Sequence, residues 1–390
     1  MNSQNTPVHI RLWHHDFWRM ATANLLLTMS VYMLLPILPL WLVDSVSLNS
    51  EQIGMVMGAF GLGLYLFGSM TSYLVQRYRR NQVCIWAIMG MLACIAFLYY
   101  IHQYHQECSF SMMLVQRVAF GAFFGLAQMV LASTLIIDTS ESFQRTEANH
   151  SASWFARFAM SLGPLSALVI YPLYGVSAVL LASGGCAFLA TILILLVHFP
   201  FRAPDDNVSP FSCDRFFLTQ GFILFVNLLM ITLAIGMVLA LALSLQFYSM
   251  MMVGFLMAIM ALRFVFREAE LKSEVVTGLV LIGTALLLMI TRSQAIVGFI
   301  APLFIGLGLG IIGSRFLLFF IKLSRHCQRG TSQSTYTLGW ESGIALGIGI
   351  GYALCNRDHQ LVLECALGLI IASLLLYQYT HQWFLKHKNR

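Results

Sequence analysis

Residues 216–266 read FFLTQGFILFVNLLMITLAIGMVLALALSLQFYSMMMVGFLMAIMALRFVF, and this stretch decides the fold class. It is apolar almost throughout its 51 residues, whereas one crossing of a bilayer takes about 20 residues. A single helix of that length is too long to cross once. A mild polar break falls near Ser244, so we expect two spans, at 216–240 and 244–266.

The rest of the chain has the same character. Of its 390 residues, 59% are hydrophobic and 10% are charged, whereas soluble domains carry about 25% charge. Twelve spans of about 21 residues would use roughly 250 residues, which leaves no room for a soluble enzyme module or a receptor ectodomain. The other expected spans lie at 17–43, 52–75, 82–101, 111–137, 151–173, 176–198, 275–291, 296–321, 332–355 and 360–380.

A polar stretch at 202–215 divides these spans six and six. This layout is typical of two fused helical bundles with a substrate path between them near the bilayer midplane. The polar N-terminus lacks the short apolar region and cleavage site of a signal peptide. We therefore expect an all-α integral membrane protein with an N-terminal cytoplasmic segment at 1–16, a six-helix bundle at 17–198, a cytoplasmic linker at 199–215, a second six-helix bundle at 216–380 and a cytoplasmic tail at 381–390.

The basic residues set the expected orientation. With the N-terminus inside, 18 of the 22 Lys and Arg residues fall in cytoplasmic loops or span ends, and Arg157 is counted among them. Arg292 and Arg357 fall outside, while Arg117 and Arg315 fall within spans. Because cytoplasmic loops carry the excess of positive charge, both termini are expected in the cytoplasm.

The acidic residues single out one position within the expected spans. Fifteen of the sixteen, Glu274 among them, fall in loops or at span ends, and Glu341 alone falls in a membrane core. It lies nine residues into its span, or about 14 Å, which is near the midplane. An ionisable residue at that depth usually marks an ion or substrate pathway, and desolvation favours proton uptake by a carboxylate. Glu341 is thus the expected proton carrier; the alternative is a structural hydrogen bond to a neighbouring helix.

Arg117 is the expected companion of Glu341. It lies in the outer half of the fourth span and shares a helical face with Gln128. Arg315 lies seven residues before Lys322 and is close enough to the inner surface to snorkel there, so Arg117 is the better candidate for function. A direct Arg117–Glu341 pair is a hypothesis, because the two belong to different bundles.

A short loop motif carries a family resemblance. Residues 72–80 read SYLVQRYRR and resemble the loop signature of the major facilitator superfamily, a glycine followed by Leu-x-Asp-Arg-x-Gly-Arg-Arg. Leu74, Arg77 and Arg80 match this signature, whereas Gln76 replaces its aspartate.

Three further segments resemble the same superfamily. Residues 117–121, RVAFG, are similar to its Arg-x-x-Gln-Gly pattern. Gly163 and Pro164 resemble the core of a motif found in exporters that exchange substrate for protons, and the segment 315–351 looks like the drug and sugar efflux branch. This resemblance implies a proton-coupling role for Arg117. It also implies gating residues, which are Gln76, Arg77, Arg80, Gly163 and Pro164.

Polar and aromatic positions complete the expected site. Helices one, four, seven and ten line the cavity in the family, and polar residues at helical spacing occur on the expected first and seventh spans. Interhelical hydrogen bonds, worth about 0.6 kcal/mol each on average, are the alternative explanation for any one of them. The expected substrate-binding residues are Asn24, Thr28, Tyr32, Gln128, Gln220, Asn227, Tyr336 and Trp340.

Together these features predict a secondary transporter that exports a small amphipathic molecule or drug in exchange for protons by alternating access. Its expected partners are that molecule, protons and the lipid bilayer of a bacterial inner membrane, and we expect a monomer. The chain lacks a Gly-x4-Gly-Lys-Ser/Thr motif, cysteine pairs with metal spacing and a catalytic constellation, so neither ATP, a cofactor, a metal, nucleic acid nor enzymatic chemistry is expected. Two alternatives remain, an importer or facilitator of a sugar or other nutrient, and a membrane protein that binds or signals without transport.

Overall fold

The structure is a computed structural model that describes residues 12–141, 143–199, 208–241, 244–325, 328–355 and 359–388. Every regular element within these residues is helical. The elements before the linker are α1 (His15–Tyr32), α2 (Leu34–Val46), α3 (Ser50–Gly63), η1 (Gly68–Met70), α4 (Thr71–Arg77), α5 (Arg80–Gln103), α6 (Phe110–Val130), η2 (Leu131–Leu135), α7 (Ile136–Asp138) and α8 (Arg145–Leu195). Those after it are η3 (Thr219–Gly221), α9 (Phe222–Leu241), α10 (Leu245–Met260), η4 (Ala261–Val265), α11 (Leu271–Thr291), α12 (Val297–Leu323), α13 (Arg329–Cys355) and α14 (His359–His387).

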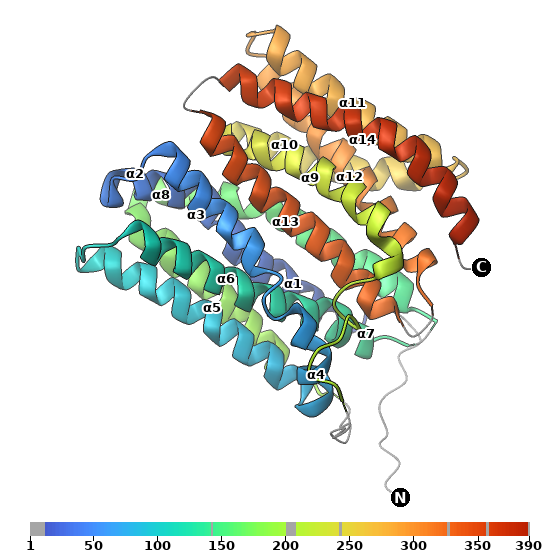
Figure 1. The fold of residues 1–390 in the computed structure, drawn as a ribbon, viewed down its shortest axis with the longest axis horizontal. Helices are drawn as coiled ribbons and strands as arrows, with labels where there is room; N and C mark the ends of the chain where they lie inside the picture. The colour runs from blue at the N-terminus through green and yellow to red at the C-terminus, as the bar shows by residue number, and fades with distance from the viewer. Residues whose placement is uncertain are drawn as a thin grey trace, which may run out of the picture.

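The long helices run roughly alongside one another, and the two ends of the described chain lie at the same end of the array (Figure 1). Among the residues that the structure describes, ten helical segments are long and apolar enough to cross a membrane. α8 counts once among these ten although it contains two expected spans, and the more polar α13 is not among them. When α8 is divided into its two spans and α13 is included, each of the twelve expected spans corresponds to a helical segment.

Two expected helix boundaries are confirmed by local structure. Ser244 caps α10, because its side chain accepts a hydrogen bond from the backbone N–H of Phe247 at 3.2 Å. α8 breaks at Gly175, where φ is 74°, a left-handed value that glycine adopts without steric cost. This break falls between the expected spans at 151–173 and 176–198.

The first crossing is interrupted at its centre. α1 ends at Tyr32 and α2 begins at Leu34, with Pro36 and Pro39 in the first two turns of α2. Proline has no backbone N–H and clashes with the preceding turn, so the helix cannot continue regularly through this point. The interruption places Tyr32 at a helix end in the interior of the protein.

The two halves of the chain meet along α3 and α13, which pack against each other. A Cβ atom added to Gly54 of α3 would overlap the carbonyl oxygen of Gly349 in α13. Glycine therefore permits a closer approach of the two backbones here than any other residue would allow.

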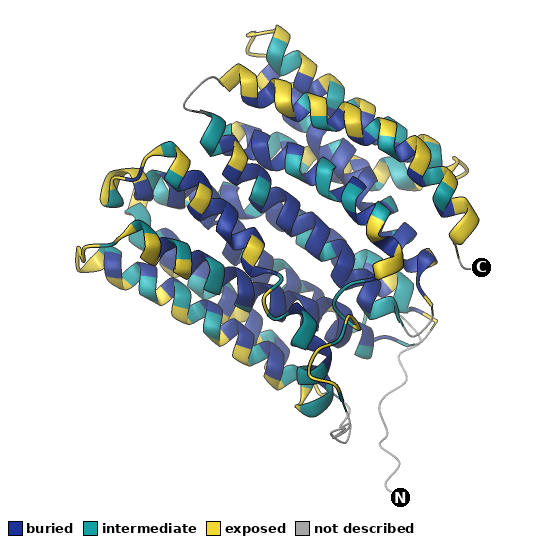
Figure 2. Ribbon diagram, viewed as in Figure 1, coloured by how far each residue is buried: buried dark blue, intermediate teal, exposed yellow. Residues whose placement is uncertain are grey.

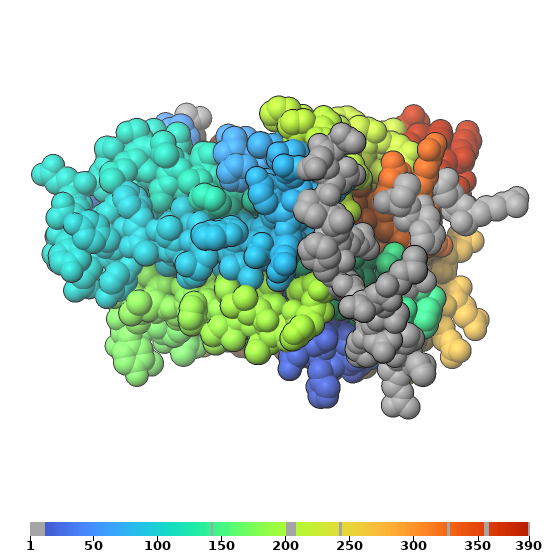
Figure 3. Space-filling model, turned by 90° about the horizontal axis from the view of Figure 1, so that it is seen from below, coloured from blue at the N-terminus to red at the C-terminus, as the bar shows by residue number. Residues whose placement is uncertain are grey.

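Burial follows the arrangement of the helices. The central helices are buried along most of their length, and exposed residues gather on the outer faces of the array (Figure 2). Many exposed residues are large and apolar, such as Trp86 in α5, Leu189 in α8 and Leu375 in α14. Figure 3 shows one such face, where α5 lies beside the second part of α8. Outer faces of this composition are suited to lipid rather than to water.

Candidate functional site

Glu341 lies at the centre of α13, twelve residues after the first residue of that helix, or about 18 Å along it. Its side chain is buried, with 5% of the residue exposed. The hydroxyl of Tyr32, at the interrupted end of α1, donates a hydrogen bond to Glu341 Oε2 at 3.0 Å. No basic side chain within the described ranges lies close enough to form an ion pair with this carboxylate.

Arg117 in α6 is equally buried, with 4% exposed. Its guanidinium carbon lies 5.1 Å from the centre of the Phe60 ring and 5.5 Å from that of Phe120. Two of its nitrogens, Nε and one terminal nitrogen, are buried without a hydrogen-bond partner among the described residues. Aromatic rings stabilise a desolvated cation by about 2 kcal/mol, which leaves most of the cost of burying this charge uncompensated.

Tyr32, Arg117 and Glu341 line one cavity of about 30 Å³. This volume holds one or two water molecules. The remaining lining residues are Val31, Leu35, Met57, Phe60, Ile344, Ala345 and Ile348. The structure thus brings the two expected coupling residues to a single site, from helices on opposite sides of the linker, without joining them in a direct ion pair.

Contacts between the halves close this cavity on both sides of Glu341 along α13. Toward the end of α13, Ser50 Oγ donates to the carbonyl oxygen of Tyr352 at 2.5 Å. Nearer the centre, the Tyr65 hydroxyl and Ser342 Oγ lie 2.8 Å apart. Toward the start of α13, a third set of contacts involves the expected gating residues. The described conformation is therefore closed around a small cavity of about 30 Å³.

One expected gating residue, Gln76, lies in a polar network near the start of α13. Gln76 Nε2 donates to Ser72 Oγ at 2.7 Å, and Ser72 Oγ donates to Asp214 Oδ2 at 3.3 Å. Asp214 Oδ1 also accepts from Thr331 Oγ1 of α13 at 3.1 Å. The amide that replaces the signature's aspartate is thus connected through a serine to a carboxylate of the linker.

The other expected gating residues lie where α4 ends and α5 begins, and within α8. Arg80, at the start of α5, forms an ion pair with Asp138 of α7, while Arg77 ends α4. Gly163 lies in α8 against α1, where an added Cβ would be 2.8 Å from the Cβ of Tyr32. Gly163 thus packs against Tyr32, the residue that donates a hydrogen bond to Glu341, and the buried Pro164 follows it in α8.

Three expected substrate-binding residues form a buried cluster outside this cavity. Gln128 Nε2 donates to Asn24 Oδ1 at 3.0 Å, and Asn24 Nδ2 donates to the carbonyl oxygen of Ala152 at 3.0 Å. Thr28 bonds back to the carbonyl oxygen of Asn24 at 2.8 Å. These contacts join α1, α6 and α8.

The structure does not place Gln220 and Asn227 on one shared face, contrary to the expectation. Gln220 lies in the short turn η3, is exposed and donates to the carbonyl oxygen of Leu323 at 2.9 Å. Asn227 is buried between α9 and α14 and donates to the carbonyl oxygen of Ser373 at 3.0 Å. The expected face assumed one helix from residue 216, whereas α9 begins at Phe222.

Tyr336 and Trp340 precede Glu341 on α13. Both are buried, and their ring centres lie 5.9 Å apart. The Tyr336 hydroxyl is buried without a hydrogen-bond partner in the described part of the chain. It is therefore free to bond to a molecule that enters beside it.

The expectation that Arg157 is a cytoplasmic surface charge is wrong. Arg157 lies inside α8 with 1% exposed, donates to the carbonyl oxygen of Gly310 at 3.1 Å and to Ser153 Oγ at 2.5 Å, and stacks 4.1 Å from the ring centre of Trp154. Its position six residues inside the expected span at 151–173, about 9 Å along a helix, was the signal for this burial.

Glu274 lies in the first turn of α11, at a span end as expected, but it is buried and pairs with Arg315. α11 begins at Leu271, four residues before the expected span, so Glu274 lies within the helix and is buried. Arg315 of α12 forms an ion pair with this carboxylate, and its own side chain is 19% exposed. Glu341 is therefore not the only acid buried among the helices.

Comparison with solved structures identifies proteins with the same fold at low sequence identity. The POT family transporter PepTSo is similar with a TM-score of 0.72 at 12% identity, over 97% of this chain and 100% of that one. A bacterial homologue of the human lysosomal transporter Spinster gives 0.68 at 12% identity, over 96% and 98%. The nucleoside transporter NupG gives 0.64 at 13% identity, over 93% and 99%.

Among curated proteins, no sequence match to this chain was found. The sequence profile of the Major Facilitator Superfamily matches residues 20–348, most of the chain, which agrees with the apolar helices and with the fold of the structural relatives. The chain is therefore an integral membrane protein with a transporter fold, and it belongs to the Major Facilitator Superfamily.

Proposed function

We propose that the protein is a secondary transporter that exports a small amphipathic molecule in exchange for protons by alternating access. The observation that carries this proposal is the cavity in which Glu341 and Arg117, both buried and neither ion-paired with a described residue, approach from opposite halves of the chain. Two buried ionisable groups without an ion-pair partner among the described residues are costly in a membrane protein and are typically kept for function.

Glu341 is the proposed proton carrier. A carboxylate can bind and release a proton, and this one accepts a hydrogen bond from the Tyr32 hydroxyl. When the halves separate on one side, water from that side reaches the carboxylate; when they separate on the other, the proton leaves there. Arg117 lines the same cavity, and its proposed role is to change the proton affinity of Glu341 as the two halves rock.

The substrate is proposed to occupy an enlarged form of the same cavity. At about 30 Å³ the closed cavity is far smaller than a site of about 300–1,000 Å³ for a drug-sized molecule. Its wall combines apolar residues with two charged groups and a phenol, which suits an amphipathic molecule. Tyr32, Tyr336 and Trp340 are the proposed substrate-binding residues nearest Glu341, whereas Asn24 and its neighbours hold helices together in this conformation.

We place both termini in the cytoplasm of a bacterial cell, in the inner membrane. The support is the excess of Lys and Arg in the loops at that end of the helices. We further propose that the protein works as a monomer and performs no enzymatic reaction, because the cavity between its own halves supplies the whole path.

The test uses the purified protein in liposomes that contain a pH-sensitive dye. Chemically diverse compounds are added in turn, and we expect at least one to drive proton movement. Glu341→Gln should abolish this exchange, whereas Glu51→Gln, at the exposed start of α3, should retain it.

Each of three outcomes would contradict a different part of the proposal. Full proton-coupled exchange by Glu341→Gln would exclude Glu341 as the carrier. Substrate uptake without proton movement would support a nutrient importer instead. Binding of a compound without any movement across the liposome would support a protein that binds without transport.

A further inference from the structure

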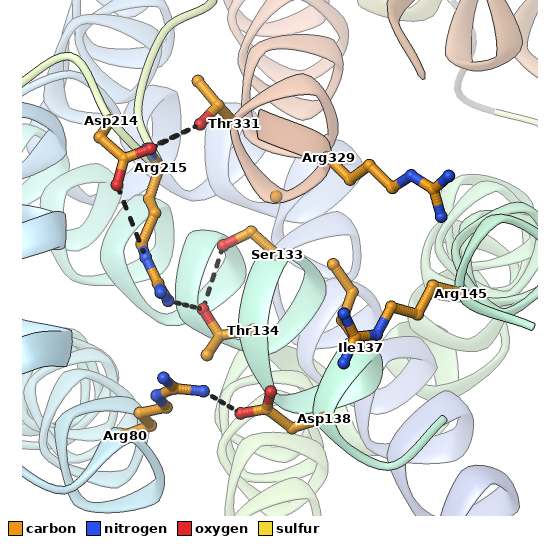
Figure 4. A pocket seen from close by; sticks show the side chains of 11 residues that line it. Arg80, Ser133, Thr134, Ile137, Asp138, Arg145, Asp214, Arg215, Arg329 and Thr331 are labelled. Carbon is orange, nitrogen blue, oxygen red and sulfur yellow. Dashed lines mark hydrogen bonds and ion pairs between the residues drawn. The ribbon is translucent and has the colours of Figure 1, made fainter. Parts of the chain in front are cut away.

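A second cavity, of about 220 Å³, lies at the end of the helices where α13 begins (Figure 4). It is separate from the Glu341 cavity and shares no lining residue with it. Four arginines surround it, from the starts of α5, α8 and α13 and from the end of the linker. The lining residues are Arg80, Ser133, Thr134, Ile137, Asp138, Arg145, Asp214, Arg215, Arg329, Gly330 and Thr331. We call this the arginine pocket.

The arginine pocket carries more positive than negative charge. Its four arginines face two aspartates, and both aspartates are engaged. Asp138 pairs with Arg80, and Asp214 lies 3.9 Å from Arg215 Nε. Arg145 and Arg329 have no ion-pair partner in the part of the chain that the structure describes. The Nε of Arg145 is moreover buried without a hydrogen-bond acceptor among the described residues.

Helix geometry adds to this positive charge. α8 begins at Arg145 and α13 begins at Arg329, so the N-termini of two long helices meet at the pocket. The first backbone N–H groups of a helix have no partner within it, and its N-terminus carries a partial positive charge. The side chain of Gln144, the residue before α8, makes no capping hydrogen bond to these groups. Two arginines without an ion-pair partner among the described residues, each at the N-terminus of a long helix, therefore line the same cavity.

We propose that the arginine pocket binds a phosphate-bearing anion. Guanidinium groups bind phosphate oxygens in pairs of parallel hydrogen bonds, and helix N-termini bind the same group. The hydroxyls of Thr134 and Thr331 line the same space. The pocket has the volume of about seven liquid waters, so a phosphate fits there together with part of its hydration. The anion is the headgroup of a phospholipid or a free phosphate compound.

Binding at this pocket would bias the conformation of the protein. Arg80 and Arg145 lie before the linker, whereas Arg329 begins α13 in the second half. An anion held by both Arg145 and Arg329 connects the halves at this end. Since a ligand stabilises the conformation it binds best, the anion stabilises the arrangement that is closed at this end. Separation of the halves here would disassemble the pocket and release the anion.

The first test measures binding of inorganic phosphate to the full-length protein in an uncharged detergent. Thermal unfolding is followed while phosphate replaces chloride at constant ionic strength. We expect a saturable rise in the melting temperature. Arg145→Gln and Arg329→Gln should each weaken phosphate binding about tenfold or more, the size expected for loss of one charge-assisted hydrogen bond. Arg292→Gln, at an exposed arginine of another loop, is the matched control and should bind as the unaltered protein does.

The second test distinguishes the two sources of the phosphate group. The same unfolding measurement is made in lipid nanodiscs of phosphatidylcholine alone and of phosphatidylcholine with phosphatidic acid. Stabilisation by phosphatidic acid without an effect of inorganic phosphate, lost in Arg145→Gln, identifies a lipid headgroup. Stabilisation by inorganic phosphate identifies a soluble anion.

The proposal is overturned if neither anion stabilises the protein, or if both glutamine variants and Arg292→Gln respond as the unaltered protein does. Arg145→Lys and Arg329→Lys are controls for a folding defect in the glutamine variants, because they keep the positive charge. They should bind phosphate more tightly than the glutamine variants, and equal loss in both kinds of variant would also overturn the proposal.

Discussion

The buried ion pair between Glu274 and Arg315 leads to a stability prediction whose size follows from the structure. The Glu274 side chain is 1% exposed and that of Arg315 is 19% exposed. Glu274→Gln keeps the shape of the side chain but leaves the guanidinium without its carboxylate. Breaking a buried pair in this way costs about 3–5 kcal/mol, because the remaining charge is desolvated and uncompensated. Arg315→Met should cost a similar amount for the converse reason.

The double variant, Glu274→Gln with Arg315→Met, distinguishes this explanation from a loss of packing. Replacing both members of a buried pair is often neutral, so most of the stability should return. The measurement is the free energy of unfolding of the purified protein in mixed micelles as the fraction of denaturing detergent rises. The four proteins then form a double-mutant cycle, which isolates the interaction between the two residues.

The exposed pair of Asp16 and Arg19 supplies the control, since these side chains are 30% and 40% exposed. Asp16→Asn should cost about 0–1 kcal/mol, as is usual for a surface pair. The reasoning is refuted if Glu274→Gln costs no more than Asp16→Asn. It is also refuted if the double variant loses as much stability as the two single variants together.

Three other substitutions test the site and its surroundings. Tyr32→Phe removes the hydroxyl that donates to Glu341. Proton exchange in liposomes should then fall about tenfold or more while the melting temperature changes little. Unchanged exchange would contradict a role for this bond. Gly54→Val should destabilise the closed state by about 1–3 kcal/mol, because the valine side chain would overlap Gly349. Faster labelling of a cysteine placed at position 345 would report the opening. Arg157→Met removes a fully buried cation that has no ion-pair partner among the described residues. The melting temperature should therefore stay the same or rise. A clear fall would show that the two hydrogen bonds of Arg157 contribute more to stability than its desolvation costs.

The linear sequence determined the features that depend on local composition. The span boundaries at Ser244 and near Gly175 follow from a polar cap and from a break in an apolar run, and both need only neighbouring residues. Glu341 was identified in the same way, as an acid within an apolar segment. Such signals survive in a membrane protein because every helix must satisfy its own backbone hydrogen bonds, whatever packs beside it.

Only the tertiary structure decided which helices meet. Tyr32 and Glu341 are 309 residues apart in the chain, and nothing local indicated that one donates to the other. Arg157 was misplaced, and the burial of Glu274 was not predicted, because both faces of these helices are apolar. Periodicity therefore cannot separate a face toward lipid from a face toward protein. In a soluble protein water would mark that difference. In a bilayer the packing of neighbouring helices alone decides which charges are buried, and it brought Arg117 and Glu341 to one cavity.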